Sequence, residues 1–399
     1  MTPGAGIFRT QLPQGFFAQG INCGVRRYRP DLGMIVSEQS AVAAGVFTQS
    51  TCQAAPVVHS KALLPADNIK AVITNSGQAN AATGQQGDLD NQAMVAATAE
   101  ALNCDSTQVL AASTGVIGES MQIDLITAAI PDLAANVTNM AEKFALAIMT
   151  TDLVPKTVYK TLTLQGKTVT ITGIAKGSGM IHPNMATMLG YLLTDVQMAP
   201  AQAQSMLTDV TNNSFNMISV DGDTSTNDSV FLLANGESGV VLEQDEDIAT
   251  FQQALQDVAI LLAKSIARDG EGATKLIEVQ IVNAPDLDLA KSVARSLTVS
   301  PLIKTAIYGE SPNWGRLIGR LGMAQVPAEL LATLSIRCQD LLLYDQGQAA
   351  TDDLQALKIG MREDTVVLTI DLKSGDHCAT AWGCDLSERY VKINAEYVT

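Results

Sequence analysis

The sequence predicts an α/β fold. Short apolar runs typical of buried strands alternate along the chain with longer segments whose apolar residues recur at helical spacing. With 47% hydrophobic and 17% charged residues, the 399-residue chain has an ordinary globular composition and ample material for a core. This length allows about two to three domains. Because the chain contains no linker, repeat or low-complexity segment, we expect these domains to be interleaved.

The N-terminal half alternates strands with helices. We expect Asp88 to cap the first helix, because an aspartate before an alanine-rich run can accept hydrogen bonds from the first free amides. A Gln165-Gly166 pair between two alternating runs predicts a hairpin. The expected strands are 33–48, 69–74, 108–112, 158–164 and 168–174, and the expected helices are 88–102, 123–135 and 138–149.

The C-terminal half continues this alternation. Pro200 suits the first turn of a helix, and the glycines of Asp269-Gly-Glu-Gly272 end the longest amphipathic segment. We expect a polar turn at Asp221–Asp228 to join two core strands. The expected strands are 188–193, 217–220, 230–234, 276–282, 335–344 and 365–372, and the expected helices are 200–212, 246–268 and 286–298.

Charge and hydropathy exclude several classes of partner. A net charge of −16 argues against binding to nucleic acid or to an anionic membrane. The sequence has no run of 18 apolar residues and no N-terminal segment in which basic residues precede an apolar stretch. The six cysteines are scattered and form no C-x-x-C pair. We therefore expect a cytoplasmic protein with free thiols.

Neither a metal nor a nucleotide site is predicted. Asp221–Asp228 resembles the start of a calcium loop, but Leu232 occupies the position that needs a bidentate acid. Gly166-Lys167-Thr168 resembles the end of a phosphate-binding loop without its upstream glycine. The three histidines lie far apart in the sequence, which favours a nucleophile that needs no histidine. We expect no metal and no bound cofactor.

The segment from Lys176 to Asp195 carries the main catalytic candidate. A glycine-rich loop is followed by an apolar run, and Thr187 lies at the junction, directly after Ala186. The Thr187 hydroxyl could attack the Ala186 carbonyl in an N→O acyl shift, and cleavage would leave an α-amine to serve as the base for that hydroxyl. On local sequence alone, an ordinary glycine-rich turn into a core strand remains the alternative.

Two other loops carry chemically suitable groups. Thr114 and Gly115 follow a predicted strand and could offer a hydroxyl and an amide to an oxyanion. Glu271 lies between two glycines, where we expect an exposed carboxylate. The alternatives are a plain strand-to-helix turn and a solvated turn residue.

Taken together, eight stretches resemble the ornithine acetyltransferases, also called glutamate N-acetyltransferases, of arginine biosynthesis. They occur in the order of the family and span nearly the whole chain, so the match is strong although each stretch alone is weak. The stretches are Asn75–Gly84, Ser113–Gly118, Thr150–Asp152, Lys176–Leu189, Ser219–Asp228, Gly270–Lys275, Pro312–Arg316 and Ile393–Thr399.

The resemblance implies a layered helix-sheet-sheet-helix core and cleavage between Ala186 and Thr187. Residues 1–186 would form an alpha chain and residues 187–399 a beta chain, assembled as a heterotetramer with two of each. Thr187 would take an acetyl group from N-acetylornithine and pass it to glutamate in a ping-pong reaction. The residues matched to the site are Thr187 as nucleophile, Thr114 and Gly115 as oxyanion hole, and Thr150, Lys176, Glu271, Asn394 and Thr399 as substrate-binding positions.

Other functions stay open at this point. A self-cleaving amidohydrolase or aminopeptidase would share the N-terminal threonine nucleophile but give the acyl group to water. A small-molecule-binding protein without catalytic activity would keep its chain intact. The sequence also leaves open whether acetyl-CoA is a second acetyl donor, because acetyl-CoA binding need not leave a nucleotide motif.

Overall fold

A computed structural model describes residues 10–182, 188–350 and 353–396 and confirms the α/β class. The strands are β1 (Phe16–Ile21), β2 (Leu32–Phe47), β3 (Ala66–Gln78), β4 (Val109–Val116), β5 (Lys156–Leu164), β6 (Lys167–Lys176), β7 (Leu189–Thr194), β8 (Ile218–Ser219), β9 (Ser229–Ala234), β10 (Leu276–Ala284), β11 (Ser335–Cys338), β12 (Leu341–Asp345), β13 (Gln348–Ala349), β14 (Thr365–Asp371) and β15 (His377–Cys384).

Helices cover the faces of the sheets that these strands form. They are α1 (Ala55–Leu63), α2 (Gly84–Leu102), α3 (Ile123–Ala135), α4 (Glu142–Ala147), α5 (Pro200–Asn212), α6 (Asp245–Arg268), α7 (Leu287–Thr298), α8 (Pro301–Tyr308), α9 (Trp314–Met323), α10 (Ala328–Thr333), α11 (Leu354–Gly360) and α12 (Glu388–Glu396). Short 3₁₀ turns at Ser106–Gln108 and Phe215–Met217 precede β4 and β8.

The first sheet has eight strands and bends at β2. Its order is β4-β3-β2-β9-β7-β6-β5, and β1 pairs with the first half of β2. The second half of β2 pairs with β9, from Val42 opposite Ala234 to Phe47 opposite Ser229. Between these halves the register with β3 shifts, as expected where extra residues bend a strand. This bend folds the sheet over on itself.

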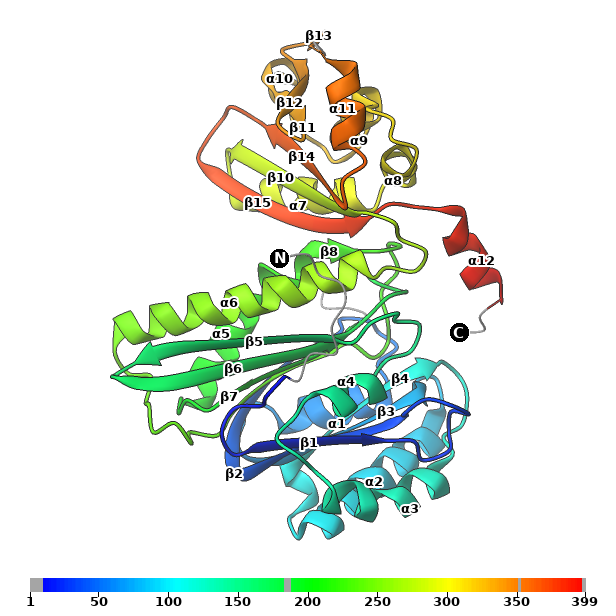
Figure 1. The fold of residues 1–399 in the computed structure, drawn as a ribbon, viewed down its shortest axis with the longest axis vertical. Helices are drawn as coiled ribbons and strands as arrows, with labels where there is room; N and C mark the ends of the chain where they lie inside the picture. Colours follow the sequence, from blue (N-terminus) through cyan, green and yellow to red (C-terminus); the bar gives the residue numbers. More distant parts are fainter. Residues whose placement is uncertain (1–9, 183–187, 351–352, 397–399) are drawn as a thin grey trace.

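The folded sheet gives four layers, seen in the lower two thirds of Figure 1. One apolar cluster fills the space between the two halves of the sheet and includes Val72 of β3 and Tyr191 of β7. The Tyr191 hydroxyl also bonds the Thr74 hydroxyl across the halves, at 2.8 Å. Helices α5 and α6 pack on the outer face of one half, and α2 and α3 on the outer face of the other. The helix-sheet-sheet-helix core is therefore confirmed.

The second sheet is built from strands distant in sequence. Its order is β13-β12-β11-β14-β10-β15-β8, and α7 packs on β10 and β15. The chain enters this sheet at β8, returns to the first sheet at β9, and enters the second again at β10. The two parts are interleaved, as expected. However, the strands expected at 217–220 and 230–234 belong to different sheets, so the turn between them crosses from one sheet to the other.

Several other expectations about single elements need correction. Helices 123–135 and 200–212 have the expected bounds, but α2 begins at Gly84, so Asp88 lies inside the helix and does not cap it. The expectations for 33–48 and 276–282 match β2 and β10 closely. The sequence analysis missed β1, β13, β15, α1 and α8 through α12, and it expected one strand at 335–344 where β11 and β12 form an antiparallel pair. Most of these are short and owe their conformation to the neighbours they pack against.

No helix in the described ranges is long and apolar enough to cross a membrane. All six cysteines are free thiols, as the sequence predicts.

Candidate active site

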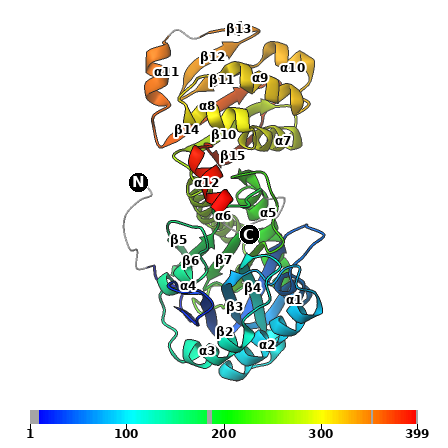
Figure 2. The ribbon, with the colours of Figure 1, turned by 90° about the vertical axis from the view of Figure 1, so that its right-hand side faces the viewer.

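The ends of several strands and loops meet at a cavity of about 190 Å³. It lies where α12 approaches the first sheet, and Figure 2 shows α12 at the junction between the two parts of the molecule. Six residues matched to the site by sequence line this cavity, although they are spread from one end of the chain to the other. They are Thr114, Gly115, Thr150, Lys176, Glu271 and Asn394.

Lys176 and Thr114 are in direct contact. Lys176 ends β6, and its Nζ donates a 3.1 Å hydrogen bond to Thr114 Oγ1 at the end of β4. Because Thr114 Oγ1 accepts this bond, the Thr114 hydroxyl hydrogen is left to donate elsewhere. Burial is the main reason that the pKa of Lys176 is lowered, and the positive charge of Lys156 opposes the carboxylates around it. This arrangement provides a desolvated cationic donor beside a hydroxyl.

A buried network of ion pairs lies close to Lys176. Lys156 Nζ contacts Asp152 Oδ1 at 2.7 Å and Asp269 Oδ2 at 2.6 Å, and all three side chains are buried. Burial opposes ionisation of Asp152, but Lys156 and then Lys176 lower its pKa below the usual range. Asp152 also accepts from the Gly177 amide at 2.7 Å and the Thr150 amide at 3.0 Å. The network therefore fixes both Thr150 and the start of the glycine-rich loop.

Gly115 needs to be glycine. Its φ of +134° is rarely adopted by other residues, and a Cβ there would lie 2.2 Å from the carbonyl carbon of Gly77. The close approach follows from the parallel pairing of β3 with β4, which places Gly77 opposite Gly115. The Thr114-Gly115 pair is thus held at the carboxyl ends of two adjacent parallel strands, where an open sheet commonly presents its ligand-binding groups.

Glu271 is buried, which corrects the expectation of an exposed carboxylate. Its accessible fraction is 8%, because the glycine-rich loop and α12 cover it. Its backbone amide donates to Ser178 O at 3.0 Å, and its Oε2 accepts from Asn394 Nδ2 at 2.8 Å. A Cβ on Gly179 would come within 2.4 Å of the Glu271 carboxylate. A side chain at residue 179 would therefore displace the Glu271 carboxylate from this position.

The stretch that resembles a calcium loop braces the glycine-rich loop. The Asp221 carboxylate accepts hydrogen bonds from the Met180 amide at 2.6 Å and the Ile181 amide at 2.9 Å. Asn227 Nδ2 donates to Ala79 O and Ser113 O, which ties the loop after β3 to β4. The carboxylates and amides of this stretch thus hold backbone in place.

The strand after the predicted cleavage bond leads away from this cavity. Leu189, the first residue of β7, pairs with Lys176 on one side and with Ser229 on the other. The Met188 amide donates a hydrogen bond to the buried Asp228 carboxyl, whose pKa is raised well above its usual value by burial. Ala186, Thr187 and Thr399 lie outside the described residues. Met188 directly follows Thr187 and is the described residue nearest to it in the sequence.

Sequence reasoning missed several polar residues that line the cavity. These are Asp221, Asp223, Ser225, Asn227 and Tyr390. Burial, and then Asp221 and Glu271, raise the pKa of Tyr390. The density of polar residues at Asp221–Asp228 was a usable signal, but nothing local distinguishes Tyr390 from other residues on a short C-terminal helix.

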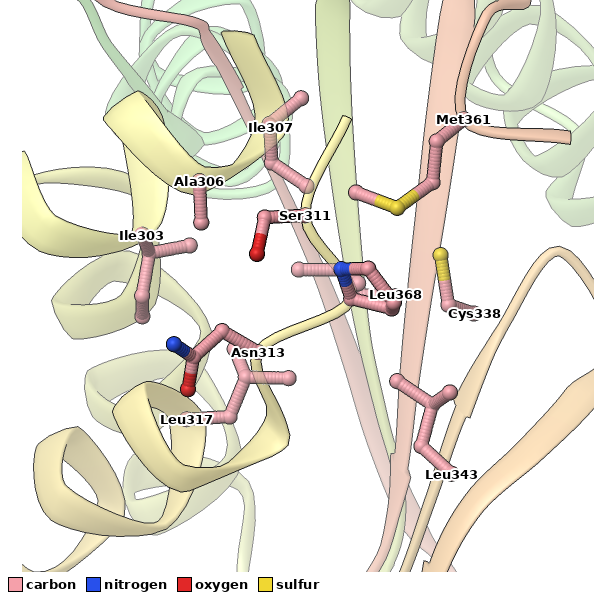
Figure 3. Close-up of a pocket in the computed structure, with 11 residues that line it drawn as sticks. Ile303, Ala306, Ile307, Ser311, Asn313, Leu317, Cys338, Leu343, Met361 and Leu368 are labelled. Carbon is pink, nitrogen blue, oxygen red and sulfur yellow. The ribbon is translucent and has the colours of Figure 1, made fainter. Parts of the chain in front are cut away.

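One stretch matched to the family lies away from this cavity. Asn313 caps α9, where its side chain accepts from the Arg316 amide at 3.2 Å. Ser311 and Asn313 line a separate, mostly apolar hollow beneath α8, together with Leu317, Cys338 and Leu368 (Figure 3). Pro312–Arg316 therefore serves the packing of the second sheet.

Comparisons with known proteins agree with the resemblance. The model of the ArgJ family matches residues 17–399. Two proteins named arginine biosynthesis bifunctional protein ArgJ are similar to this chain over 97% of its length. The protein from Oceanobacillus iheyensis is 46% identical to this chain, and the match covers 95% of that protein. The protein from Thermotoga neapolitana is 42% identical, and the match covers 100% of that protein. A crystal structure of arginine biosynthesis bifunctional protein ArgJ from Bacillus halodurans shares 39% identity at a TM-score of 0.51, covering 53% of this chain and 100% of that one.

Proposed function

This chain belongs to the ArgJ family, and on that premise we propose that it transfers an acetyl group from N-acetylornithine to glutamate through an acetyl ester on Thr187. The products are ornithine and N-acetylglutamate, and the enzyme acts in arginine biosynthesis. Acetyl-CoA is a second acetyl donor to the same threonine, in keeping with the word bifunctional in the names of the relatives.

One observation carries this proposal. The Lys176 ammonium and the Thr114 hydroxyl meet at 3.1 Å in a cavity that also holds Gly115, Glu271 and Asn394. The cavity offers a cation for a substrate carboxylate, and Glu271 for a substrate ammonium. N-acetylornithine and glutamate both carry an α-carboxylate, and N-acetylornithine also carries a side-chain ammonium. The charges of the cavity therefore complement both substrates.

The transfer proceeds in two halves. The Thr187 hydroxyl attacks the acetyl carbonyl of N-acetylornithine while the Thr187 α-amine takes the hydroxyl proton. The Thr114 hydroxyl and the Gly115 amide stabilise the oxyanion. The C–N bond then breaks, and the departing ornithine amine takes this proton from the α-amine. In the second half the neutral α-amine of glutamate attacks the ester, the C–O bond to Thr187 breaks, and the proton lost by the glutamate amine returns to the Thr187 oxygen. An α-amine has an ordinary pKa of about 8, close enough to neutrality for a base.

Self-cleavage precedes this chemistry. The Thr187 hydroxyl attacks the Ala186 carbonyl, the amide becomes an ester, and water releases an alpha chain of residues 1–186. The beta chain, 187–399, then holds 213 residues, a share of the chain close to the 53% that the Bacillus halodurans chain covers. This similarity of length supports the proposed division. An assembly of two alpha and two beta chains, and a cytoplasmic location, are further parts of the proposal.

Two measurements test the proposed function. Mass analysis of the purified protein should find two fragments, the second beginning at Thr187, and Thr187→Ala should remain one inactive chain. Glutamate supplied with N-acetylornithine should then yield N-acetylglutamate and ornithine in equal amounts. An amidohydrolase would release acetate without a requirement for glutamate. A single intact wild-type chain, or acetate as the only acetyl product, would refute the proposal.

A further inference from the structure

A second cavity lies next to His182, which follows the part of the glycine-rich loop that lines the first cavity. Its volume is about 580 Å³, within the ~300–1,000 Å³ of ordinary small-molecule sites. His182, the last described residue before Thr187, lies on its wall. His182 O also accepts from Thr224 Oγ1, close to Asp223 of the first cavity. The two cavities therefore adjoin the same loop.

One face of α7 forms most of the wall. The residues of this face recur at helical spacing, so they lie along one line of the helix. The opposite face, which includes Ala290, Val293 and Leu297, is buried against the second sheet. The remaining wall comes from the end of α5, the turn before β8, and α9. The α7 residues are Asp288, Lys291, Ser292, Arg295 and Ser296, and Val299, which directly follows the helix, also lines the cavity.

The cavity is cationic, although the whole chain has a net charge of −16. Lys291 and Arg295 lie one helical turn apart, and Arg320 reaches in from α9. Arg320 Nε donates hydrogen bonds to Ser296 O and Ser296 Oγ, both at 2.9 Å. Burial lowers the pKa of Arg295 and Arg320.

Lys291 and Arg320 have no carboxylate within ion-pair distance among the residues that the structure describes. Asp288, which is exposed, is the only acid among the residues that line this cavity. A cluster of this kind in an acidic protein attracts anions, because cationic walls concentrate the local potential.

The first cavity is unsuited to a highly charged anion. It holds Lys176 but also Asp221, Asp223 and Glu271, so its carboxylates outnumber its ammonium. That balance fits amino acids, which carry an ammonium as well as carboxylates, and repels a phosphorylated ligand. The second cavity has the opposite balance, with serine hydroxyls beside three cations. Phosphate groups take hydrogen bonds from arginine, lysine and hydroxyl donors.

We propose that this second cavity binds the phosphate groups of acetyl-CoA, which donates its acetyl group to Thr187. The inference rests on the proposed function, because Thr187 must accept the acetyl group from either donor. The acetyl group passes from sulfur to the Thr187 oxygen, the C–S bond breaks, and free CoA leaves with the proton. The two donors thus bind in different cavities.

Reversing the charge of Lys291 or Arg320 tests whether the two acetyl donors bind at different sites. In Lys291→Glu and Arg320→Glu, the KM for acetyl-CoA should rise about tenfold or more, since each change removes a charged hydrogen bond to a phosphate. The KM and kcat for N-acetylornithine should stay within about twofold of wild type, because its site lies in the other cavity. Lys358→Glu, an exposed change of equal charge on α11, is the matched control and should alter neither donor.

A competition assay identifies the source of the phosphate. Desulfo-coenzyme A should compete with acetyl-CoA in the wild type and lose affinity in Lys291→Glu. Inorganic phosphate at equal concentration should compete weakly. Equal competition by inorganic phosphate would show a general anion site and refute the assignment to CoA.

The remaining outcomes are equally decisive. An unchanged acetyl-CoA KM in both reversals overturns the inference, and so does an equal rise for both donors. A wild-type enzyme that transfers from N-acetylornithine but never from acetyl-CoA also overturns it, while leaving N-acetylornithine-dependent transfer intact. Failure of transfer from N-acetylornithine itself would instead refute the proposed function.

Discussion

At the scale of single residues, the site depends on groups whose neighbours decide their chemistry. Thr114 would be an ordinary strand-end threonine without the Lys176 ammonium at 3.1 Å and without the close backbone approach of Gly77 to Gly115. Glu271 would be a solvated turn residue without Asn394 and the loop that covers it. The identity of each residue was readable from the sequence, but its environment was not.

We expect Thr114→Ala to lower kcat by about a hundredfold, or ~3 kcal/mol, because one oxyanion donor is lost from a desolvated site. The fold should persist, since a small side chain at a partly exposed position leaves no cavity in the core. Thr114→Ser, which keeps the hydroxyl, is the control and should retain most activity. Steady-state kinetics with N-acetylornithine and glutamate measures both, and an alanine variant with wild-type kcat would exclude this role.

Asp228 should make stability depend on pH. Burial raises the pKa of its carboxyl well above the value of about 3.9 in an unfolded chain. A raised folded-state pKa means that unfolding releases a proton between the two values. The contribution of Asp228 is therefore fully present below pH about 3.9 and is lost as pH rises through the folded-state pKa. Oδ2 of this carboxyl is buried without a hydrogen-bond partner among the described residues.

The test is Asp228→Asn, which keeps the shape and removes the ionisable group. The melting temperature of the variant relative to wild type should increase as pH is raised from about 4 to 8. Asp67→Asn, at an exposed position at the start of β3, should show no such trend. A difference that stays constant across this pH range would show that Asp228 does not titrate as described.

At the scale of elements, strand β5 carries two lysines that form ion pairs, the buried Lys156 and the more exposed Lys160. Lys156→Met leaves Asp152 and Asp269 buried without their cation, and should cost about 3–5 kcal/mol. Lys160 pairs with Asp257 at 2.6 Å, but both side chains are more than a third exposed, so Lys160→Met should cost less than about 1 kcal/mol.

Urea unfolding of both variants, made in a Thr187→Ala background to keep one chain, provides the comparison. Lys156→Met should also raise the KM for N-acetylornithine in the cleaved enzyme, because Asp152 fixes the Thr150 amide and the Gly177 amide. Equal losses of stability in the two variants would contradict the importance given to burial.

At the scale of the whole molecule, the proposed cleavage would not separate the sheet into independent parts. In the order β4-β3-β2-β9-β7-β6-β5, the beta chain supplies only β9 and β7, which lie between strands of the alpha chain. Leu189 to Thr194 pairs along its full length with β6, and the second half of β2 pairs with β9. The two largest apolar clusters therefore contain residues of both fragments.

We therefore expect the two fragments to elute together from a sizing column in native buffer and to separate only on a denaturing gel. Raising the salt concentration should not release them, because apolar burial and backbone hydrogen bonds are little screened by salt. Fragments that part in high salt without denaturant would show that the interface is mainly electrostatic and that the sheet is not continuous.

The sequence by itself determined the α/β class, the bounds of elements such as α3 and α5, and six of the residues that line the candidate site. Periodicity and turn residues act locally, so these features can be read within a short window. The resemblance to the family supplied the layered core, and the register shift in β2 shows how one sheet provides both of its inner layers.

Only the tertiary structure decided which of those residues meet. Segments far apart in the chain meet to bury Glu271 and to bring Lys176 into contact with Thr114. Pairing with distant strands also places β8 and β9 in two different sheets. The cationic cavity between α7 and α9 likewise has no local signature, because Lys291 and Arg320 look like ordinary surface residues in sequence. Their meaning depends on long-range packing, which brings them to one cavity, where neither makes an ion pair with a carboxylate among the described residues.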